Sequence, residues 1–98
     1  MRAVLFMREQ LDLADDIFAQ LVIWSLPRKL PGSDRRFKYR LALMASGVCV
    51  LRYDNESGKG DHKHFGKREL PYVFSDIESL LVDFWTDADE WLKKNSTR

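Results

Sequence analysis

Cysteine is nearly absent from this 98-residue sequence, and so are long apolar runs. A single cysteine, Cys49, excludes an internal disulfide and a zinc site built from cysteines, so we expect a reducing compartment, the cytoplasm. Near position 20 the longest apolar run is Leu21-Val22-Ile23-Trp24, far short of the ~18 residues that span a membrane. The first residues, Met1-Arg2-Ala3-Val4-Leu5-Phe6, do not resemble a secretory signal. The sequence predicts one soluble domain over residues 1–98, with no contact to a membrane.

Net charge is also nearly absent, but the charges are unevenly distributed. The formal net charge is +1, yet residues 1–26 carry −2, residues 27–70 carry +6 and residues 71–98 carry −3. A basic middle between acidic ends predicts an anionic partner for that middle, with nucleic acid as the first candidate. The alternative is that these lysines and arginines only solvate loops and an exposed sheet face.

The clearest periodicity predicts a C-terminal helix over residues 75–94. Ser75 and Glu78 fit a capping box at its start, and Lys93 and Lys94 suit the negative end of the helix dipole. Apolar residues recur at spacings of three and four, as on one face of an amphipathic helix: Phe74, Ile77, Leu81, Phe84, Ala88 and Trp91.

The middle of the chain predicts a β-hairpin. Residues 37–43 alternate between apolar and polar, residues 45–47 supply a turn and residues 48–54 form the second strand. A three-residue loop pairs Met44 with Val48, whereas a two-residue loop shifts the pairing by one and directs apolar side chains to the wrong face. We therefore expect the first register, which sets Arg40 opposite Arg52 and Lys38 opposite Asp54. Facing arginines suit an anion bound between them; alternatively, both extend into solvent or find carboxylates.

The N-terminal third is compatible with a helix, but its β-rich segment before Pro27 favours two strands joined near residues 14–16. The predicted fold is therefore α+β: an antiparallel sheet of about four strands in two hairpins, with the C-terminal helix packed on one face. Residues 55–70 are expected to form a loop across one sheet edge. The expected core consists of Leu41, Leu43, Leu51, Tyr53, Ile77, Leu81, Phe84 and Trp91.

Both histidines lie in the segment Asp61-His62-Lys63-His64. In an extended chain His62 and His64 point to the same side, and this pair suits two chemistries. One is metal-free ribonuclease chemistry, in which one imidazole takes the proton of the ribose 2′-OH and the other protonates the leaving oxygen. The other is metal binding, with Asp54 or Asp61 as a third ligand. The pair also fits a polar loop without function. Gly58-Lys59-Gly60 lacks the spacing of a phosphate-binding P-loop.

Several of these segments together resemble the TumE-type toxin family of prokaryotic toxin–antitoxin systems. The most specific is the block from Tyr53-Asp54-Asn55 to Asp61-His62-Lys63-His64. Val22 to Pro27 and Pro71 to Phe74 are also similar to the family pattern, so that the resemblance covers residues 17–92. It implies a small toxin encoded beside a DNA-binding antitoxin, and a hairpin at the N-terminus. The tip Ala14-Asp15-Asp16 departs from the Asp-Gly turn expected there.

From these observations we expect a toxin that acts on RNA as a metal-independent ribonuclease without a cofactor. The expected partners are RNA and a helix-turn-helix antitoxin from the adjacent gene, and a homodimer stays open. The alternative is a non-catalytic module that binds RNA or a protein with a basic sheet face. We expect His62, His64, Asp61 and Lys59 to serve catalysis, and Arg40, Arg52, Lys38, Asp54 and Tyr53 to bind the substrate.

Overall fold

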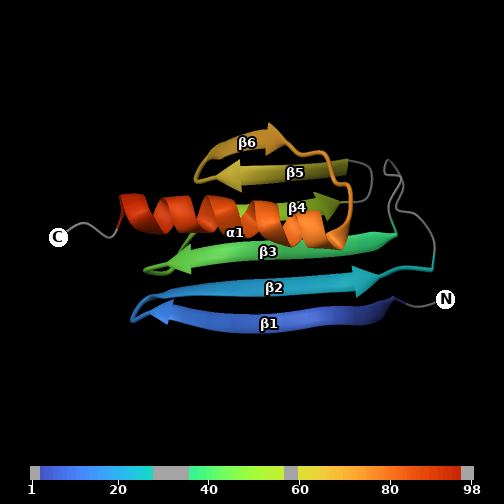
Figure 1. The fold of residues 1–98 in the computed structure, drawn as a ribbon, viewed down its shortest axis with the longest axis horizontal. Helices are drawn as coiled ribbons and strands as arrows, with labels where there is room; N and C mark the ends of the chain where they lie inside the picture. Colours follow the sequence, from blue (N-terminus) through green and yellow to red (C-terminus); the bar gives the residue numbers. More distant parts are fainter. Residues whose placement is uncertain (1–2, 28–35, 57–59, 96–98) are drawn as a thin grey trace.

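The computed structural model describes residues 3–27, 36–56 and 60–95. It contains one antiparallel sheet of six strands in sequential order, β1 to β6, and one helix, α1 (Figure 1). The elements are β1 (Val4–Ala14), β2 (Ile17–Ser25), β3 (Phe37–Ala45), β4 (Val48–Glu56), β5 (Gly60–Phe65), β6 (Arg68–Pro71) and α1 (Ile77–Lys94).

The α+β class, the N-terminal hairpin and the C-terminal helix are confirmed, but the expected number of about four strands is too low. The segment predicted as a loop over residues 55–70 contributes the end of β4, all of β5 and all but the last residue of β6. Its strands carry many polar residues, so they lack the apolar alternation by which a half-buried strand is recognised. Residues 57–59 of this segment, including Lys59, lie outside the described residues.

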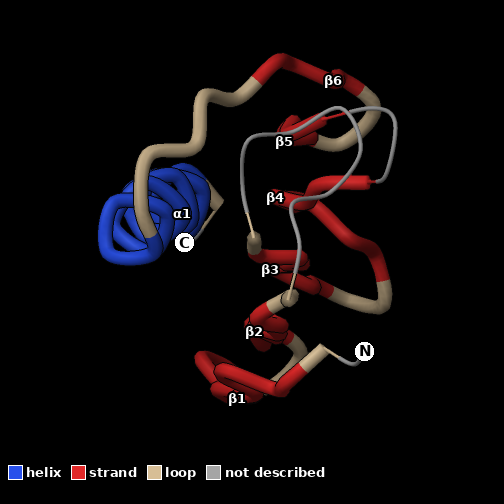
Figure 2. Tube along the Cα trace, turned by 90° about the vertical axis from the view of Figure 1, so that its right-hand side faces the viewer, coloured by secondary structure: helices blue, strands red, loops and turns tan. Residues whose placement is uncertain are grey.

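Helix α1 packs on one face of the sheet, and all six strands lie on one side of it (Figure 2). The fully buried core joins the sheet residues Tyr39, Leu41, Leu43, Leu51 and Tyr53 to the helix residues Leu80, Phe84 and Ala88. Ile77, Leu81 and Trp91, which were expected in the core, are partly buried at its rim. No helix in the described part of the chain is long and apolar enough to cross a membrane.

The helix begins slightly later than predicted, because Asp76 and not Ser75 is its N-cap. Oδ1 of Asp76 accepts a hydrogen bond of 2.7 Å from the backbone N–H of Ser79, which satisfies one of the free amide donors of the first turn. The hydrogen bonding of Asp76 with Ser79 lowers the pKa of the Asp76 carboxyl. A carboxylate also suits the positive end of the helix dipole better than a hydroxyl does.

The predicted register between β3 and β4 is wrong. A two-residue turn at Ser46 and Gly47 pairs Ala45 with Val48, and both turn residues have positive φ, at 52° and 78°, as hairpin turns of the primed types require. The amide and hydroxyl of Ser46 donate to the backbone and side chain of Asp16, which holds this serine in its unusual conformation.

A β-bulge then restores the faces that the short turn would have reversed. Met44 pairs with Cys49 and Leu43 pairs with Leu51, so that Val50 is an extra residue in β4. The carbonyl of Val50 accepts a hydrogen bond of 3.0 Å from the amide of Gly66. The apolar residues of β4 therefore still face α1, but every later residue pairs two positions away from the expected partner.

Hydroxyl–carboxylate contacts join the helix to the sheet, through Tyr53, and to the segment that follows β6, through Tyr72. The Tyr53 hydroxyl donates to the carboxylate of Asp87, and Nζ of Lys63 lies 3.3 Å from the same carboxylate. The Tyr72 hydroxyl donates to Asp83 over 2.5 Å. Burial, followed by the carboxylate partner, raises the pKa of Tyr53 and of Tyr72 above the ordinary value. Both hydroxyls thus remain protonated donors at neutral pH.

Replacing Tyr53 by Phe should lower the free energy of unfolding by about 1.5–3 kcal/mol, because a hydrogen bond to a charged group is lost. Urea denaturation measures this change, and Ser75→Ala, which removes an exposed hydroxyl, serves as the control. Equal stability of Tyr53→Phe and the wild type would show that this contact does not hold the helix to the sheet.

Candidate active site

Strand alternation separates the predicted site residues between the two faces of the sheet. Leu41, Leu51 and Tyr53 lie in the core beneath α1, so their neighbours in sequence point to the opposite face. That face carries six of the predicted residues: Lys38, Arg40, Arg52, Asp54, His62 and His64. They come from three adjacent strands, β3, β4 and β5.

Four of these residues form a compact group, here called the histidine cluster: Arg52, Asp54, His62 and His64. Asp54 pairs directly with His62, and Arg52 pairs directly with His64, across β4 and β5. The two imidazole rings meet edge to face with centroids 4.9 Å apart. Two ladder pairs of the sheet thus bring two imidazoles, a carboxylate and a guanidinium together.

Asp54 lies between His62 and Arg52 of the cluster. Its Oδ1 is 2.9 Å from Nε2 of His62, and its Oδ2 is 3.0 Å from Nε of Arg52. Neither Oδ1 of Asp54 nor Nε of Arg52 has a hydrogen bond of good geometry from any described protein group. Both contacts are therefore close approaches rather than aligned hydrogen bonds, and Oδ1 of Asp54 and Nε of Arg52 keep capacity for another partner.

Arg52 also contacts His64, with Nη2 3.0 Å from Nε2 of the imidazole. Since a guanidinium can only donate, Nε2 of His64 is the acceptor and the ring proton is on Nδ1. Burial, and then the positive charge of Arg52, lowers the pKa of His64. His64 is therefore neutral at pH 7, with a lone pair on the nitrogen that faces Arg52.

The described residues contain one group that could hold a metal ion: Asp54, His62 and His64, whose ligand atoms lie within 4.8 Å of one another. Two imidazoles and a carboxylate are suitable ligands for zinc and related ions. Arg52 opposes this use, because its guanidinium contacts both Asp54 and His64. A bound cation would have to displace that positive charge.

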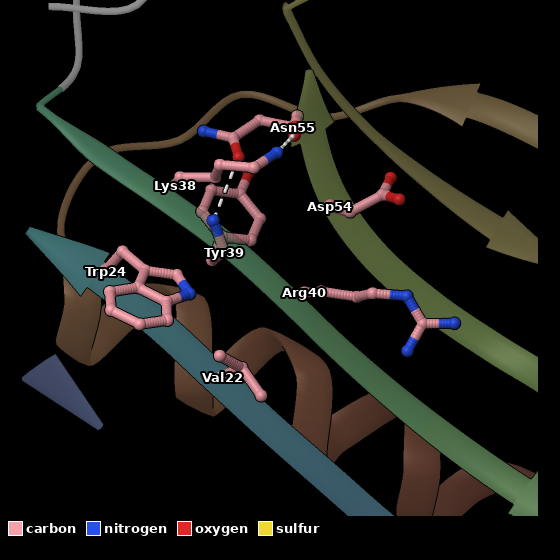
Figure 3. A pocket seen from close by; sticks show the side chains of 7 residues that line it. All are labelled: Val22, Trp24, Lys38, Tyr39, Arg40, Asp54 and Asn55. Atoms are coloured by element: carbon pink, nitrogen blue, oxygen red, sulfur yellow. Dashed lines mark hydrogen bonds between the residues drawn. The ribbon is translucent and has the colours of Figure 1, made fainter. Parts of the chain in front are cut away.

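A pocket of about 390 Å³ adjoins the cluster at the start of β3 (Figure 3). Asp54 and Arg40 form one side, and the side chains of Val22 and Trp24 form another. Across β2 and β3, Val22 pairs with Arg40 and Trp24 pairs with Lys38. The pocket thus combines an aromatic ring with two cations, which suits a base and its phosphate.

Asn55 opens this pocket. The β3–β4 ladder ends at Arg40 and Asp54, and beyond it the buried side chain of Asn55 replaces the backbone partner. Its Oδ1 accepts from the amide of Tyr39 over 2.9 Å, and its Nδ2 donates to the carbonyl of Phe37 over 2.7 Å. The inserted side chain holds the two strands apart and satisfies their backbone groups at the same time.

Val22, Trp24 and Asn55 line the pocket but were not predicted as site residues. Val22 and Trp24 alternate with the buried Leu21 and Ile23, so they had to point away from the core. An outward-facing tryptophan was the available signal. Asn55 gave no such signal, because its role depends on where the ladder ends.

The expected pair of facing arginines does not form. Arg40 pairs with Asp54, and Arg52 pairs with Ala42 on one side and His64 on the other. The bulge at Val50 causes this shift. Both arginines still lie on the same face. Asp54 pairs with Arg40 across β3 and β4, and its carboxylate contacts Arg52.

Tyr53 and Asp61 lie on the other face, away from the imidazoles. Tyr53 is buried beneath α1, and the Asp61 carboxylate accepts a hydrogen bond of 2.6 Å from the Tyr39 hydroxyl. Asp54 is therefore the carboxylate in position to orient an imidazole. Lys38 lies at the pocket, where its Nζ is 3.4 Å from the carbonyl of Asn55.

The lowered pKa of His64 predicts a specific pH dependence. Because the folded state disfavours the imidazolium, stability is lost as the pH falls through about 6.5, the ordinary value for histidine, where the unfolded chain takes up the proton first. NMR titration should give His64 a pKa below about 6.5, and Arg52→Gln should raise it because a nearby cation is removed. The same pKa in both proteins would contradict the assigned contact. Arg68→Gln, at an exposed position of β6, is the control.

A comparison with known protein families gives a match. A family model described as toxin TumE matches residues 2–92. No curated protein and no solved structure matches the chain. The match covers all six strands and nearly all of α1, and with them every residue of the histidine cluster. The chain belongs to the TumE toxin family.

Proposed function

We propose that this toxin binds RNA on the sheet face opposite α1 and cleaves it by metal-independent acid–base chemistry. The observation that carries the proposal is the histidine cluster, in which two imidazoles contact a carboxylate and a guanidinium. The side chains of His62, His64 and Asp54 are each less than one-fifth exposed. Such a low-dielectric, prearranged site suits transfer of protons and stabilisation of charge.

Binding of the substrate would use the pocket and the two arginines. A base stacks on Trp24, and the adjoining phosphate lies between Arg40 and Arg52. The phosphate then replaces Asp54 and His64 as the partner of the Arg52 guanidinium, because guanidinium groups bind phosphate in a bidentate manner. This exchange frees the lone pair on Nε2 of His64.

His64 is the general base and His62 is the general acid. Nε2 of His64 takes the proton of the ribose 2′-OH, whose oxygen then forms a bond to phosphorus. As the bond from phosphorus to the 5′-oxygen breaks, Nε2 of His62 donates its proton to that leaving oxygen. The products are a 2′,3′-cyclic phosphate and a 5′-hydroxyl. Arg52 stabilises the extra negative charge on the phosphorane.

The surroundings of the two rings support this assignment. A guanidinium lies beside His64, and a lowered pKa keeps that ring unprotonated and ready to accept. Carboxylates lie beside His62, with Asp54 at 2.9 Å and Glu69 at 4.0 Å from its Nε2. Asp54 Oδ1 also lies 3.9 Å from Nε2 of His64, so the nearest charged group is a carboxylate for His62 and a guanidinium for His64, as suits a pair with opposite catalytic roles.

The alternative is a toxin that binds RNA or a protein without cleaving it. One observation favours this reading: Arg52, Asp54 and His64 already contact one another, as in a closed structural network. A binding module needs the arginines and the pocket but has no turnover to lose.

Replacing either histidine by alanine should lower the rate of RNA cleavage by about 10²–10⁴-fold, the contribution of a positioned acid or base, and should leave RNA affinity nearly unchanged. Single-turnover cleavage and binding assays on one RNA measure the two effects. Lys67→Ala, at an exposed turn position, is the control.

In cells, induction of the wild type should arrest growth, and co-expression of the antitoxin should relieve this arrest. Induction of either alanine variant in place of the wild type should leave growth unchanged.

These assays are run in excess chelator, where activity should persist because no step uses a metal. Loss of cleavage in EDTA and its return with one divalent ion would contradict the mechanism and make His62, His64 and Asp54 metal ligands. Tight RNA binding without any cleavage would favour the binding module.

Replacing Arg40 or Arg52 by Gln should weaken RNA binding roughly tenfold, because each loses a charge-assisted phosphate contact of about 1.5–3 kcal/mol. The dependence of affinity on salt should also become shallower, since fewer counterions are released. Thermal stability should hold in Arg40→Gln and fall in Arg52→Gln, because only Arg52 contacts both Asp54 and His64. Unchanged affinity in both variants would end the phosphate-binding role.

A further inference from the structure

Strand β1 is a long sheet edge that no described element covers. It forms one border of the six-stranded sheet and contributes little to the core, since ten of its eleven residues are exposed. Helix α1 lies over the middle of the sheet and away from this border (Figures 1 and 2). The backbone N–H and C=O groups on the outer side of β1 are therefore available to another strand.

The exposed side chains of β1 are unusually apolar for an open edge. Val4, Leu5, Phe6, Leu11 and Leu13 are each between 39% and 65% exposed. The strand contains neither proline nor lysine, two of the residues by which sheet edges commonly avoid pairing. These properties are typical of a strand that is covered in the functional assembly.

The charges of β1 specify which strand covers it. Arg8 and Asp12 pair with Val22 and Phe18 of β2 in an unbroken part of the ladder, so both point to the face opposite α1. They are four residues apart, with Gln10 midway. When two copies of β1 pair antiparallel about Gln10, Arg8 of each copy lies directly opposite Asp12 of the other, and Gln10 lies opposite Gln10.

Neighbouring registers lack this match. A two-fold axis at Glu9 sets Glu9 against Glu9, and an axis at Arg8 sets Arg8 against Arg8, both of which bring like charges together. We therefore propose that two copies of this chain pair through their β1 edges, antiparallel about Gln10, to join the two sheets into one. This proposal does not depend on the proposed ribonuclease activity.

The symmetry of this dimer has a functional consequence. The two-fold axis is perpendicular to the sheet, so both helices lie on one side of the joined sheet and both histidine clusters lie on the other. The pocket residues Val22 and Trp24 belong to β2, next to the new interface. One face of the dimer thus presents two sites to a nucleic acid.

Charge reversal tests the register directly. Arg8→Asp and Asp12→Arg should each raise the dimer Kd about tenfold or more, because two symmetric attractions become two repulsions. An equimolar mixture of the two variants should form a heterodimer, since every Arg or Asp then meets its opposite. The double variant Arg8→Asp/Asp12→Arg should dimerise like the wild type.

Sedimentation equilibrium measures these affinities, and circular dichroism confirms that each variant is folded. Lys67→Asp and Asp89→Arg make the same charge changes at exposed positions outside β1 and should leave the dimer unchanged. The mixing experiment does not need the double variant, so a folding defect in that variant leaves the test intact.

Two results would overturn the proposal. One is a wild-type chain that stays monomeric up to about 1 mM, with β1 amides protected from hydrogen exchange only when the antitoxin is added, which would assign the edge to the antitoxin. The other is a dimer whose Kd neither reversal changes, which would place the interface elsewhere.

Discussion

The extra residue at Val50 decides which side chains of β4 face the helix and which face the candidate site. A two-residue turn alone would place Arg52 and Asp54 beneath α1 and Leu51 and Tyr53 in solvent. Burying two unmatched charges costs far more than a local distortion of the ladder, so the bulge is the stable solution. All later pairing, including Asp54 with His62 and Arg52 with His64, follows from it.

The two faces that result have different chemistry. Beneath α1, tyrosine hydroxyls donate to helix carboxylates, and Lys63 pairs with Asp87, so these polar side chains have partners. On the opposite face, Asp54 and Arg52 retain buried atoms without an aligned protein hydrogen bond. Capacity left unused in a partly buried cluster is what a substrate can occupy, and this contrast favours a functional role for the histidine face.

The sequence was most informative where a periodicity extended over many residues. The apolar stripe from Phe74 to Trp91 predicted α1, and alternation predicted the β3–β4 hairpin and the common face of His62 and His64. The β1–β2 hairpin was favoured by the β-rich segment before Pro27. The N-cap was misplaced by one residue because Ser75 and Asp76 can both cap a helix. Strands β5 and β6 were missed because their polar side chains lack the signal of burial.

Other errors arose from non-local structure. No local pattern revealed the bulge at Val50, whose carbonyl is satisfied by Gly66 from a later turn, and the expected arginine pair was lost with it. The Trp24 pocket depends on three strands and on Asn55. The choice between Asp54 and Asp61 depended on whether residues 60–65 form a strand or a loop.

The proposed mechanism requires that His62 and His64 exchange protons with RNA across one phosphate. The chemical nature of the RNA ends formed by the purified toxin tests it most directly. Acid–base cleavage through the 2′-oxygen leaves a 2′,3′-cyclic phosphate on one fragment and a 5′-hydroxyl on the other, and mass spectrometry of a short synthetic RNA identifies both. A substrate with a 2′-deoxy residue at the cleaved position should resist cleavage. Fragments with a 3′-hydroxyl and a 5′-phosphate, or cleavage of the 2′-deoxy substrate, would contradict the account.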